Sequence, residues 1–525
     1  MSPQIQPPLI LSPAMGQRSA SLVGQATSEA KLRGEVYTPL EVALGMVRRL
    51  RWPSDGPCLL DPACGDGVFL EAAMRRLAEL DLPAERARHI LQEHVQGWDA
   101  HAPAIEACRA RLQAVSMELG FEGALPRLEN RDALVDDRQR FHAVLGNPPY
   151  LEAKRMPAAL KAHVKRCCPV AATGAFDLYG AFVERGFAAL EPGGELCFII
   201  PNRFLVTSYA RGLRRLLLER SWVRVFDLSG SRVFADAAVY PVVVLAREGA
   251  RVGYRALDWD GLRDPVDLPA EILRESLDGL MPLPPGTSGG RSLFVRSLAG
   301  APFEPLARRL DLRWCVSFHR AGLRDQFVFD HEPAGAVDPR RFLGGGRFQG
   351  NRGVEPYRVA WDGWWIDYDQ ARARAERNPL PPLEVHAAPK VVLCQNARRA
   401  RAGLDREGLV LKDTFLSLRC REPADLQRAW LEWAVLVLNS RLFHYLYEHL
   451  YGGTRKGGGY LHFLSRYLEP CPIPPPPDAG RVRAVHDALE AGCGDPEAAE
   501  ALVRQAWGVT PDEVEALDGY GYPEG

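Results

Sequence analysis

One short stretch of the sequence sets the expected fold of the N-terminal half: residues 59–70 read LLDPACGDGVFL. Its apolar start predicts a strand, and the spacing of apolar residues over 69–80 predicts a helix. In the turn between them, glycine lets the backbone approach a ligand closely, and the helix start offers unpaired N–H groups. The pattern can also be an ordinary strand-to-helix turn. It is not a P-loop, because the chain has no GxxxxGK(S/T).

Outward from this stretch, short apolar runs alternate with amphipathic segments up to about residue 250. Strands alternating with helices predict a largely parallel sheet that helices cover on both faces, so the expected fold class is α/β. The predicted strands are 57–60, 94–98, 141–145, 195–200, 223–228 and 239–246, and the predicted helices are 69–80, 102–117, 179–190 and 211–219.

Two further carboxylates follow the glycine-rich turn at places that suit a nucleoside. Asp99 ends the next predicted strand, where an acidic residue can bind ribose hydroxyls. Asp132 precedes the third strand and could accept a hydrogen bond from an adenine amine. Each alone is as well explained by a surface residue or a helix cap. Together with Asp61 in the turn, they indicate an adenosine-containing ligand.

The third strand runs into Gly146-Asn147-Pro148-Pro149-Tyr150. Two prolines cannot continue a central strand, so they form a stiff turn at the carboxyl edge of the sheet, where open α/β sheets bind ligands. Such a turn can aim the Asn147 amide oxygen and the Pro148 carbonyl at the two protons of an –NH2 group. That grip keeps the nitrogen lone pair available as a nucleophile, and Tyr150 can offer a flat face beside it. The alternative is a rigid surface turn.

In their order and spacing, these motifs resemble the amino-methylating DNA methyltransferases, and most closely the adenine-N6 group typified by the Taq methylase. In that group the catalytic domain precedes the target-recognition domain. The resemblance is strong over 34–250 and loose over 307–476. The matching segments are Tyr37-Thr38-Pro39, 61–67, Asp99, Asp132, 147–150, 174–179, 192–194, 200–204, 233–234, 240–244, 438–440 and 472–476.

The resemblance implies a Rossmann-like methyltransferase domain that uses S-adenosyl-L-methionine, followed by a mixed α+β target-recognition domain. It places Asn147 and Pro148 on the target amine, Tyr150 on the target base and Phe234 against the base's other face, with Pro149 completing the motif. Thr38 would lie at the methionine end of the cofactor, Asp99 on its ribose and Asp132 on its adenine. The full set of implied cofactor-binding residues is Tyr37, Thr38, Pro39, Asp61, Ala63, Cys64, Gly65, Gly67, Phe69, Asp99, Asp132, Ala133, Asn147 and Pro149.

The implied reaction flips an adenine out of duplex DNA and lets its N6 attack the sulfonium methyl directly. No metal and no covalent enzyme intermediate is needed. Cytosine-ring methylation is disfavoured, since no Pro-Cys pair is suitably placed. Three alternatives stay open: methylation of cytosine N4, methylation of RNA or a protein glutamine amide, and an inactive DNA-recognition subunit.

The net charge of −1 hides an uneven distribution along the chain. Residues 1–250 carry 30 basic and 28 acidic side chains, residues 251–470 carry 32 and 27, and residues 471–525 carry 3 and 11. The segment 390–421 contains eight basic and three acidic residues. Such a segment can bind a polyanion such as DNA, or it can be an ordinary solvated surface. The candidate DNA-binding residues are Arg398, Arg399 and Arg401, with Arg455 and Lys456 in a glycine-rich loop.

These patterns divide the chain into five expected parts. They are a mobile arm (1–33), the methyltransferase domain (34–250), a proline- and glycine-rich linker (251–306), the target-recognition domain (307–477) and an acidic end (478–525). A single helix is expected over 424–450.

Composition limits the setting of the protein. No apolar run approaches the roughly 20 residues that span a bilayer, and the N-terminus lacks the basic start of a signal peptide. The 11 cysteines form neither a CxxC pair nor a Cys/His ligand cluster, so a reduced cytoplasm of bacterial type, near the nucleoid, is expected. The expected partner is double-stranded DNA rather than a membrane. A separate restriction endonuclease is a further partner compatible with the resemblance, and a monomer is favoured.

Overall fold

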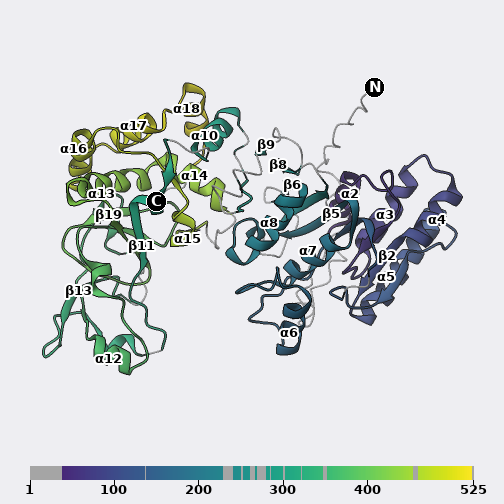
Figure 1. The fold of residues 1–525 in the computed structure, drawn as a ribbon, viewed down its shortest axis with the longest axis horizontal. Coiled ribbons are helices and arrows are strands. Elements are labelled where there is room, and N and C mark those ends of the chain that lie inside the picture. The colour runs from purple at the N-terminus through teal and green to yellow at the C-terminus, as the bar shows by residue number, and fades with distance from the viewer. Residues whose placement is uncertain are drawn as a thin grey trace, which may run out of the picture. The chain divides into compact units, whose positions relative to one another are not determined.

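The computed structural model describes residues 38–135, 138–228, 241–249, 252–259, 266–268, 273, 279–283, 285, 287–298, 302–320, 322–346, 352–452 and 459–522. The chain divides into two units, 1–283 and 284–525. Figure 1 shows the helices and strands of both units.

Unit 1 is built on a nine-stranded sheet with the order β3-β2-β1-β4-β5-β7-β6-β8-β9. Strands β1 to β5 pair in parallel, β7 runs antiparallel to both β5 and β6, β8 is parallel to β6, and β9 is antiparallel to β8. The strands are β1 (Leu59–Asp61), β2 (Val95–Asp99), β3 (Arg127–Asn130), β4 (Phe141–Gly146), β5 (Leu190–Pro201), β6 (Ser221–Asp227), β7 (Pro241–Glu248), β8 (Gly253–Asp258) and β9 (Val266–Leu268).

Helices connect the parallel strands, as the alternating pattern predicted. They are α2 (Leu40–Arg49), α3 (Val68–Glu79), α4 (Ala84–His94), α5 (Ala102–Glu118), α6 (Ala158–Cys167), α7 (Leu178–Ala188) and α8 (Arg211–Arg220). The central strands carry continuous apolar runs because helices cover both of their faces. In β1 all three residues are buried, and in β5 the last eight are.

The interval 251–306, expected to be a linker, is divided between the two units. Strands β8 and β9 extend the sheet of unit 1 beyond β6, and Tyr254 is fully buried there with its hydroxyl hydrogen-bonded to the carbonyl of Pro282. Helix α10 (Ser288–Leu298) belongs to unit 2. The unit boundary therefore falls within the proline- and glycine-rich segment 282–290, and described residues on either side of it form strands and a helix.

Unit 2 contains two four-stranded sheets, with the orders β11-β21-β17-β19 and β12-β16-β13-β20. Their strands are β11 (Leu310–Trp314), β12 (Val328–Phe329), β13 (Pro339–Leu343), β16 (Trp364–Asp367), β17 (Lys390–Cys394), β19 (Ala402–Asp405), β20 (Val410–Leu411) and β21 (Phe415–Cys420). Smaller pairings join β10 (Glu304–Pro305) to β23 (Pro472–Ile473), β14 (Val354–Glu355) to β15 (Arg358–Val359), and β18 (Asn396–Ala397) to β22 (Leu461–His462).

The helices of unit 2 differ from the sequence prediction at one place. The single helix expected over 424–450 is two helices, α13 (Ala424–Asn439) and α14 (Arg441–Tyr451). Ser440 separates them in an extended conformation, and its hydroxyl accepts a hydrogen bond from the Phe443 N–H (3.0 Å). An N-cap of this kind starts a new helix. The remaining helices are α11 (Leu306–Arg309), α12 (Gln370–Ala375), α15 (Ser465–Leu468), α16 (Ala479–Glu490), α17 (Pro496–Trp507) and α18 (Pro511–Asp518).

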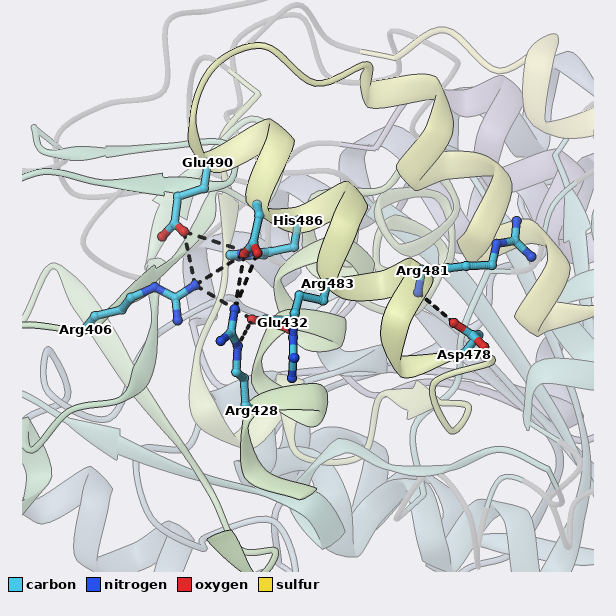
Figure 2. Close-up of polar contacts among 9 residues, drawn as sticks. Arg406, Arg428, Glu432, Asp478, Arg481, Arg483, His486 and Glu490 are labelled. Atoms are coloured by element: carbon cyan, nitrogen blue, oxygen red, sulfur yellow. Dashed lines mark hydrogen bonds and ion pairs between the residues drawn. The ribbon is translucent and has the colours of Figure 1, made fainter. Parts of the chain in front are cut away.

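The acidic end is folded into unit 2 as helices α16 to α18. Figure 2 shows ion pairs that balance part of its charge: Arg406 pairs with Glu490 (3.1 Å), and Arg428 pairs with Asp487 (3.4 Å) as well as with Glu432 of its own helix (2.5 Å). Glu432, His486 and Asp487 bring atoms that could ligate a metal within 4.8 Å of one another. The two guanidinium groups face the same carboxylates, so this cluster is better explained as an ion-pair network.

Candidate active site

The first candidate site lies where the connections of the sheet in unit 1 reverse direction. Strands β1 and β4 are parallel neighbours, with Leu59 beside Ala143 and Leu60 beside Val144. From β1 the order runs to β2 and β3 on one side and to β4 and β5 on the other. Open α/β sheets bind ligands at the carboxyl ends of the strands at such a point. The topology therefore brings the two predicted motifs, 61–67 and 147–150, to one crevice.

The two motifs approach each other closely at Gly146. A Cβ built on Gly146 would lie 2.7 Å from Oδ1 of Asp61, so the packing of β4 against the end of β1 requires glycine here. Asn147, the next residue, donates from Nδ2 to the hydroxyl of Thr38 (3.0 Å), and Thr38 is 8% exposed. The structure thus joins a residue expected on the target amine to one expected on the cofactor.

Asp61 is the most unusual charge in this crevice. It is 0% exposed, and its Oδ1 accepts one hydrogen bond, from the Ala63 N–H (3.1 Å). Among the residues that the structure describes, Oδ2 has no hydrogen-bond partner and the carboxylate forms no ion pair. Burial, with the nearby carboxylates Asp99 and Asp66 adding to it, raises the pKa of Asp61 to about 8. A buried carboxylate in this state favours a cationic or hydrogen-bond-donating ligand.

The glycine-rich turn is tied to the end of β2 through its backbone. The N–H of Gly65 donates to Oδ2 of Asp99 (3.0 Å), and the N–H of Cys64 donates to the carbonyl of Trp98 (2.9 Å). Gly67 has φ = 91°, and a Cβ there would lie 2.6 Å from the sulfur of Cys108. Both the conformation and the packing therefore require glycine, and the turn holds Asp61 and Asp99 on the same edge of the sheet.

Tyr150 is held in a fixed orientation beside Asn147. Its hydroxyl donates to the carbonyl of Ile199 (3.0 Å), and its ring meets the ring of Tyr179 edge-on at 6.0 Å between centroids. Burial raises the pKa of Tyr150, so the phenol is neutral. A ring anchored at its hydroxyl and at one edge can offer a face to a planar ligand at little cost in side-chain entropy.

A charged cluster near Tyr150 includes Asp177 and Arg203, which lie in two of the segments that carry the sequence resemblance. The resemblance implied no role for either residue. Arg203 donates from Nη2 to Oδ2 of Asp177 (2.9 Å) and from Nη1 to Oε1 of Glu152 (3.1 Å). The pKa of Asp177 is raised by burial, although the charge of Arg203 opposes the shift. Asp177 occupies the position before helix α7, which carries Tyr179, and its side chain makes no capping hydrogen bond there. The segments 174–179 and 200–204 thus act together to fix the wall behind Tyr150, a pairing that their order in the sequence did not indicate.

The other predicted cofactor residues are placed as follows. Asp132 already has a partner for each oxygen: the Leu134 N–H donates to Oδ1 (2.9 Å), and Nε2 of His163 lies 2.7 Å from Oδ2. Phe69 and Cys64 are buried in the apolar core of the unit. The remaining predicted residues are chain neighbours of those already described: Pro39 follows Thr38, Ala63 lies in the glycine-rich turn, Ala133 follows Asp132, and Pro148 and Pro149 follow Asn147. Tyr37 and Phe234 lie outside the described residues.

Two family models match separate parts of the chain. Residues 82–234 match the Eco57I restriction-modification methylase model, and residues 347–473 match the TaqI-like C-terminal specificity domain model. The segment that resembles a methylase thus precedes the segment that resembles a specificity domain. This order is the one that the motif resemblance implied.

Individual proteins support the same assignment. The chain is 29% identical over 247 residues to the type II methyltransferase M.PaeR7I of Pseudomonas aeruginosa, with 42% of each chain covered. It is 30% identical over 207 residues to M.BstVI of Geobacillus stearothermophilus, with 36% of each covered. The matches thus span less than half the length of these curated relatives.

One solved structure extends the likeness in fold to both regions. The type IIL restriction-modification enzyme MmeI, solved in complex with DNA, aligns with a TM-score of 0.53 at 12% identity, covering 91% of this chain and 75% of its own. The expected fold class, a Rossmann-like methyltransferase domain followed by a mixed second domain, is confirmed.

The basic stretch 390–421, which lies within the segment matched by the specificity-domain model, contains buried, paired and exposed cations. Lys390 is 0% exposed and forms an ion pair with Asp405, so it cannot contact DNA. Arg421 pairs with Asp311 (2.7 Å), and Arg401 lies 3.8 Å from Glu355. Arg398 is exposed, with its guanidinium over the ring of Tyr460 at 5.9 Å, and Arg399 is half-buried. Arg455 and Lys456 lie outside the described residues.

None of the helices in the described part of the chain combines the length and the apolar character that crossing a bilayer requires.

Proposed function

We propose that the protein is a site-specific DNA methyltransferase that moves a methyl group from S-adenosylmethionine to the N6 amine of an adenine flipped out of duplex DNA. Its setting would be restriction-modification, another defence system or an orphan epigenetic role. The observation that carries the proposal is the crevice between β1 and β4, where Asn147 donates a hydrogen bond to Thr38 and the adjacent Gly146 packs against the carboxylate of Asp61. The specificity region supports DNA as the substrate.

The residues of the crevice fit the proposed cofactor on chemical grounds. The buried Oδ2 of Asp61 lacks a hydrogen-bond donor among the described residues, and a cationic amino group such as that of the cofactor's methionine would supply one. Asp99 is fixed by the N–H groups of Gly65 and His101 (2.8 Å), which leaves its outer lone pairs for ribose hydroxyls. Both oxygens of Asp132 are engaged, so adenine binding there would require His163 to move or to take part.

On the substrate side, the chain's contribution is orientation. The Asn147 amide oxygen and the Pro148 carbonyl would accept the two N6 protons, which directs the nitrogen lone pair away from the ring. The ring of Tyr150 would stack on the base, and this contact offsets part of the cost of unstacking, a few kcal/mol. The bound cofactor supplies the electrophilic methyl group. Positioning of the two reactants is then the main source of rate acceleration.

The test compares substrates directly. Purified protein is incubated with S-adenosylmethionine that carries a labelled methyl group. Each reaction also contains one of three substrates: duplex DNA, RNA or a protein with an exposed glutamine. The DNA is then digested and its nucleosides identified. Label in N6-methyl-2′-deoxyadenosine from duplex DNA is the expected result. Label in N4-methylcytosine, RNA or glutamine would replace the proposed substrate, and binding of DNA without transfer would indicate a recognition subunit.

A further inference from the structure

Unit 2 contains a cavity of about 480 Å³ that none of the sequence motifs predicted. It is lined by Val316, Phe318, Arg320, Arg324, Lys412 and Asp413, with Gly322 and Asp325 at its margin. Its wall is a backbone ladder: the N–H of Val316 donates to the carbonyl of Leu411 (2.9 Å), and the N–H of Asp413 donates to the carbonyl of Val316 (2.8 Å). The side chains around it therefore start from a rigid sheet edge at β20.

Arg324 is the least satisfied cation of this cavity. Its Nη1 donates to Oδ1 of Asp325 (2.7 Å), and the guanidinium lies over the ring of Trp364 at 5.2 Å. Its Nε and Nη2 are buried and have no hydrogen-bond partner among the described residues. Lys412 is half-buried beside it, and burial together with the charge of Arg324 lowers the pKa of Lys412. Two cations held together with few partners favour a ligand that brings hydrogen-bond acceptors.

Arg320 and Asp413 are each held by contacts within the chain. Arg320 is exposed and donates to the carbonyl of Glu376 (3.1 Å), so it is anchored at the margin. Asp413 accepts a hydrogen bond from the Ser317 hydroxyl (2.6 Å) and keeps a second oxygen for a donor. The cavity thus offers donors and acceptors side by side.

The presence of both donors and acceptors in the cavity distinguishes between two parts of DNA that it could bind, a phosphate and the edge of a base pair. A phosphate offers acceptors only, and the carboxylates of Asp325 and Asp413 would repel its charge. The major-groove edge of a G·C pair offers two acceptors on guanine (O6 and N7) and one donor on cytosine (N4). Arginine and lysine can donate to the two guanine acceptors, and aspartate can accept from the cytosine amine. The chemistry of the cavity is complementary to a base-pair edge.

We infer that this cavity reads a G·C base pair of the target DNA, with Arg324 and Lys412 donating to guanine and Asp413 accepting from cytosine. The inference rests on the proposed function and deepens it, because it assigns sequence recognition to residues other than the predicted Arg398, Arg399 and Arg401. Lys412 and Asp413 lie within the matched specificity region, and Arg324 lies before it in the chain.

The test maps methylated sites by long-read sequencing of DNA treated with the full-length wild-type protein, Lys412→Met, Arg324→Gln and the control Arg481→Gln. Lys412→Met keeps the aliphatic stem and removes only the ammonium group. Arg481 is exposed on α16, so its variant controls for the loss of one positive charge in the same unit. The expected result is that Lys412→Met relaxes the recognition sequence at one G·C position, with discrimination there falling ~10–100-fold.

The salt dependence of DNA binding decides between the base edge and phosphate. A base contact leaves the slope of log K against log salt near the wild-type value, whereas loss of a phosphate contact reduces the slope by about 1. A reduced slope with unchanged sequence preference would overturn the inference, and so would an unchanged preference with an unchanged slope. If Arg324→Gln loses its melting transition because of the lost packing on Trp364, Lys412→Met decides alone. Absence of methylation by the wild type overturns the proposed function itself, which is a distinct outcome.

Discussion

Two fully buried charged sites in this molecule differ in how they are neutralised. In unit 2, Lys390 lies against Asp405, and Asp405 also accepts hydrogen bonds from the N–H groups of Glu407 (2.8 Å) and Leu409 (2.9 Å). In unit 1, Asp61 has one backbone donor and no cation among the described residues. The first is a closed structural unit, whereas the second lacks a counter-charge that the proposed cofactor would supply. The difference teaches that a buried charge marks a binding site when its own chain leaves it unbalanced.

The largest effect is expected from breaking the balanced pair. Asp405→Asn leaves the ammonium group of Lys390 buried without its counter-charge, and loss of one partner of such a pair costs ~3–5 kcal/mol. Chemical denaturation should show this loss in the free energy of unfolding. The double variant Lys390→Met/Asp405→Leu removes both charges and should recover most of the stability. Equal stability of Asp405→Asn and the wild type would show that the pair is not the structural element described above.

Asn147 provides the opposite case, a polar side chain whose loss should affect activity rather than stability. Asn147→Ala removes the acceptor proposed to hold the target amine, and the loss of one such preorganised group costs ~10²–10³-fold in kcat. Methyl transfer under single-turnover conditions measures this, with cofactor binding by calorimetry as the control. Asn147→Asp keeps an acceptor oxygen and should retain part of the activity. A fall in melting temperature large enough to account for the lost rate would argue for a structural role only, whereas a fall in cofactor affinity alone would place Asn147 on the cofactor.

The sequence predicted the crevice better than it predicted the surface of unit 2. Asp61 and Asp99 end their strands and Asn147 directly follows one, and the order of parallel strands brings such ends together, so a local motif was enough to place them. The arginines of 390–421 could not be placed in this way. Arg406 pairs with Glu490, which is 84 residues away, and a charge count along the chain does not record such a pairing.

Two elements of the fold escaped prediction for equally physical reasons. The apolar spacing of 424–450 continues through Ser440, so periodicity alone did not reveal the helix cap that divides α13 from α14. Strand β8 is short and follows a glycine, and its pairing with β6 is a tertiary contact that its own residues do not encode. The arginine–carboxylate cluster of Asp177 and Arg203 likewise depends on the packing of two distant segments.

Asp61→Asn tests whether the unbalanced carboxylate serves the cofactor. A charge-assisted hydrogen bond contributes ~1.5–3 kcal/mol, so the affinity for S-adenosylmethionine should fall ~10–100-fold in calorimetry. The variant should also change the dependence of stability on pH. Because the pKa of Asp61 rises from 3.8 to about 8 on folding, its contribution to stability is fully present below about 3.8 and is lost progressively as the pH rises through about 8. The ligand-free wild type should therefore lose more stability than Asp61→Asn between about pH 5, which lies inside this window, and about pH 9, which lies above it. Matching pH profiles would mean that Asp61 is already balanced.

The smallest effect is expected where a charge is exposed and has no ion-pair partner among the described residues. Arg398→Gln should lower the affinity for duplex DNA only a few-fold and reduce the salt slope by about 1, because an exposed arginine on a polyanion acts through counterion release. Arg421→Gln is the matched control: its guanidinium is bound to Asp311 and to the carbonyl of Ala307 (3.2 Å), so it has less charge to offer to DNA. Filter binding at several salt concentrations compares the two. An equal loss in both variants would mean that pairing within the chain does not decide which arginines meet the DNA, and the contrast between balanced and unbalanced charges would then hold for the buried sites alone.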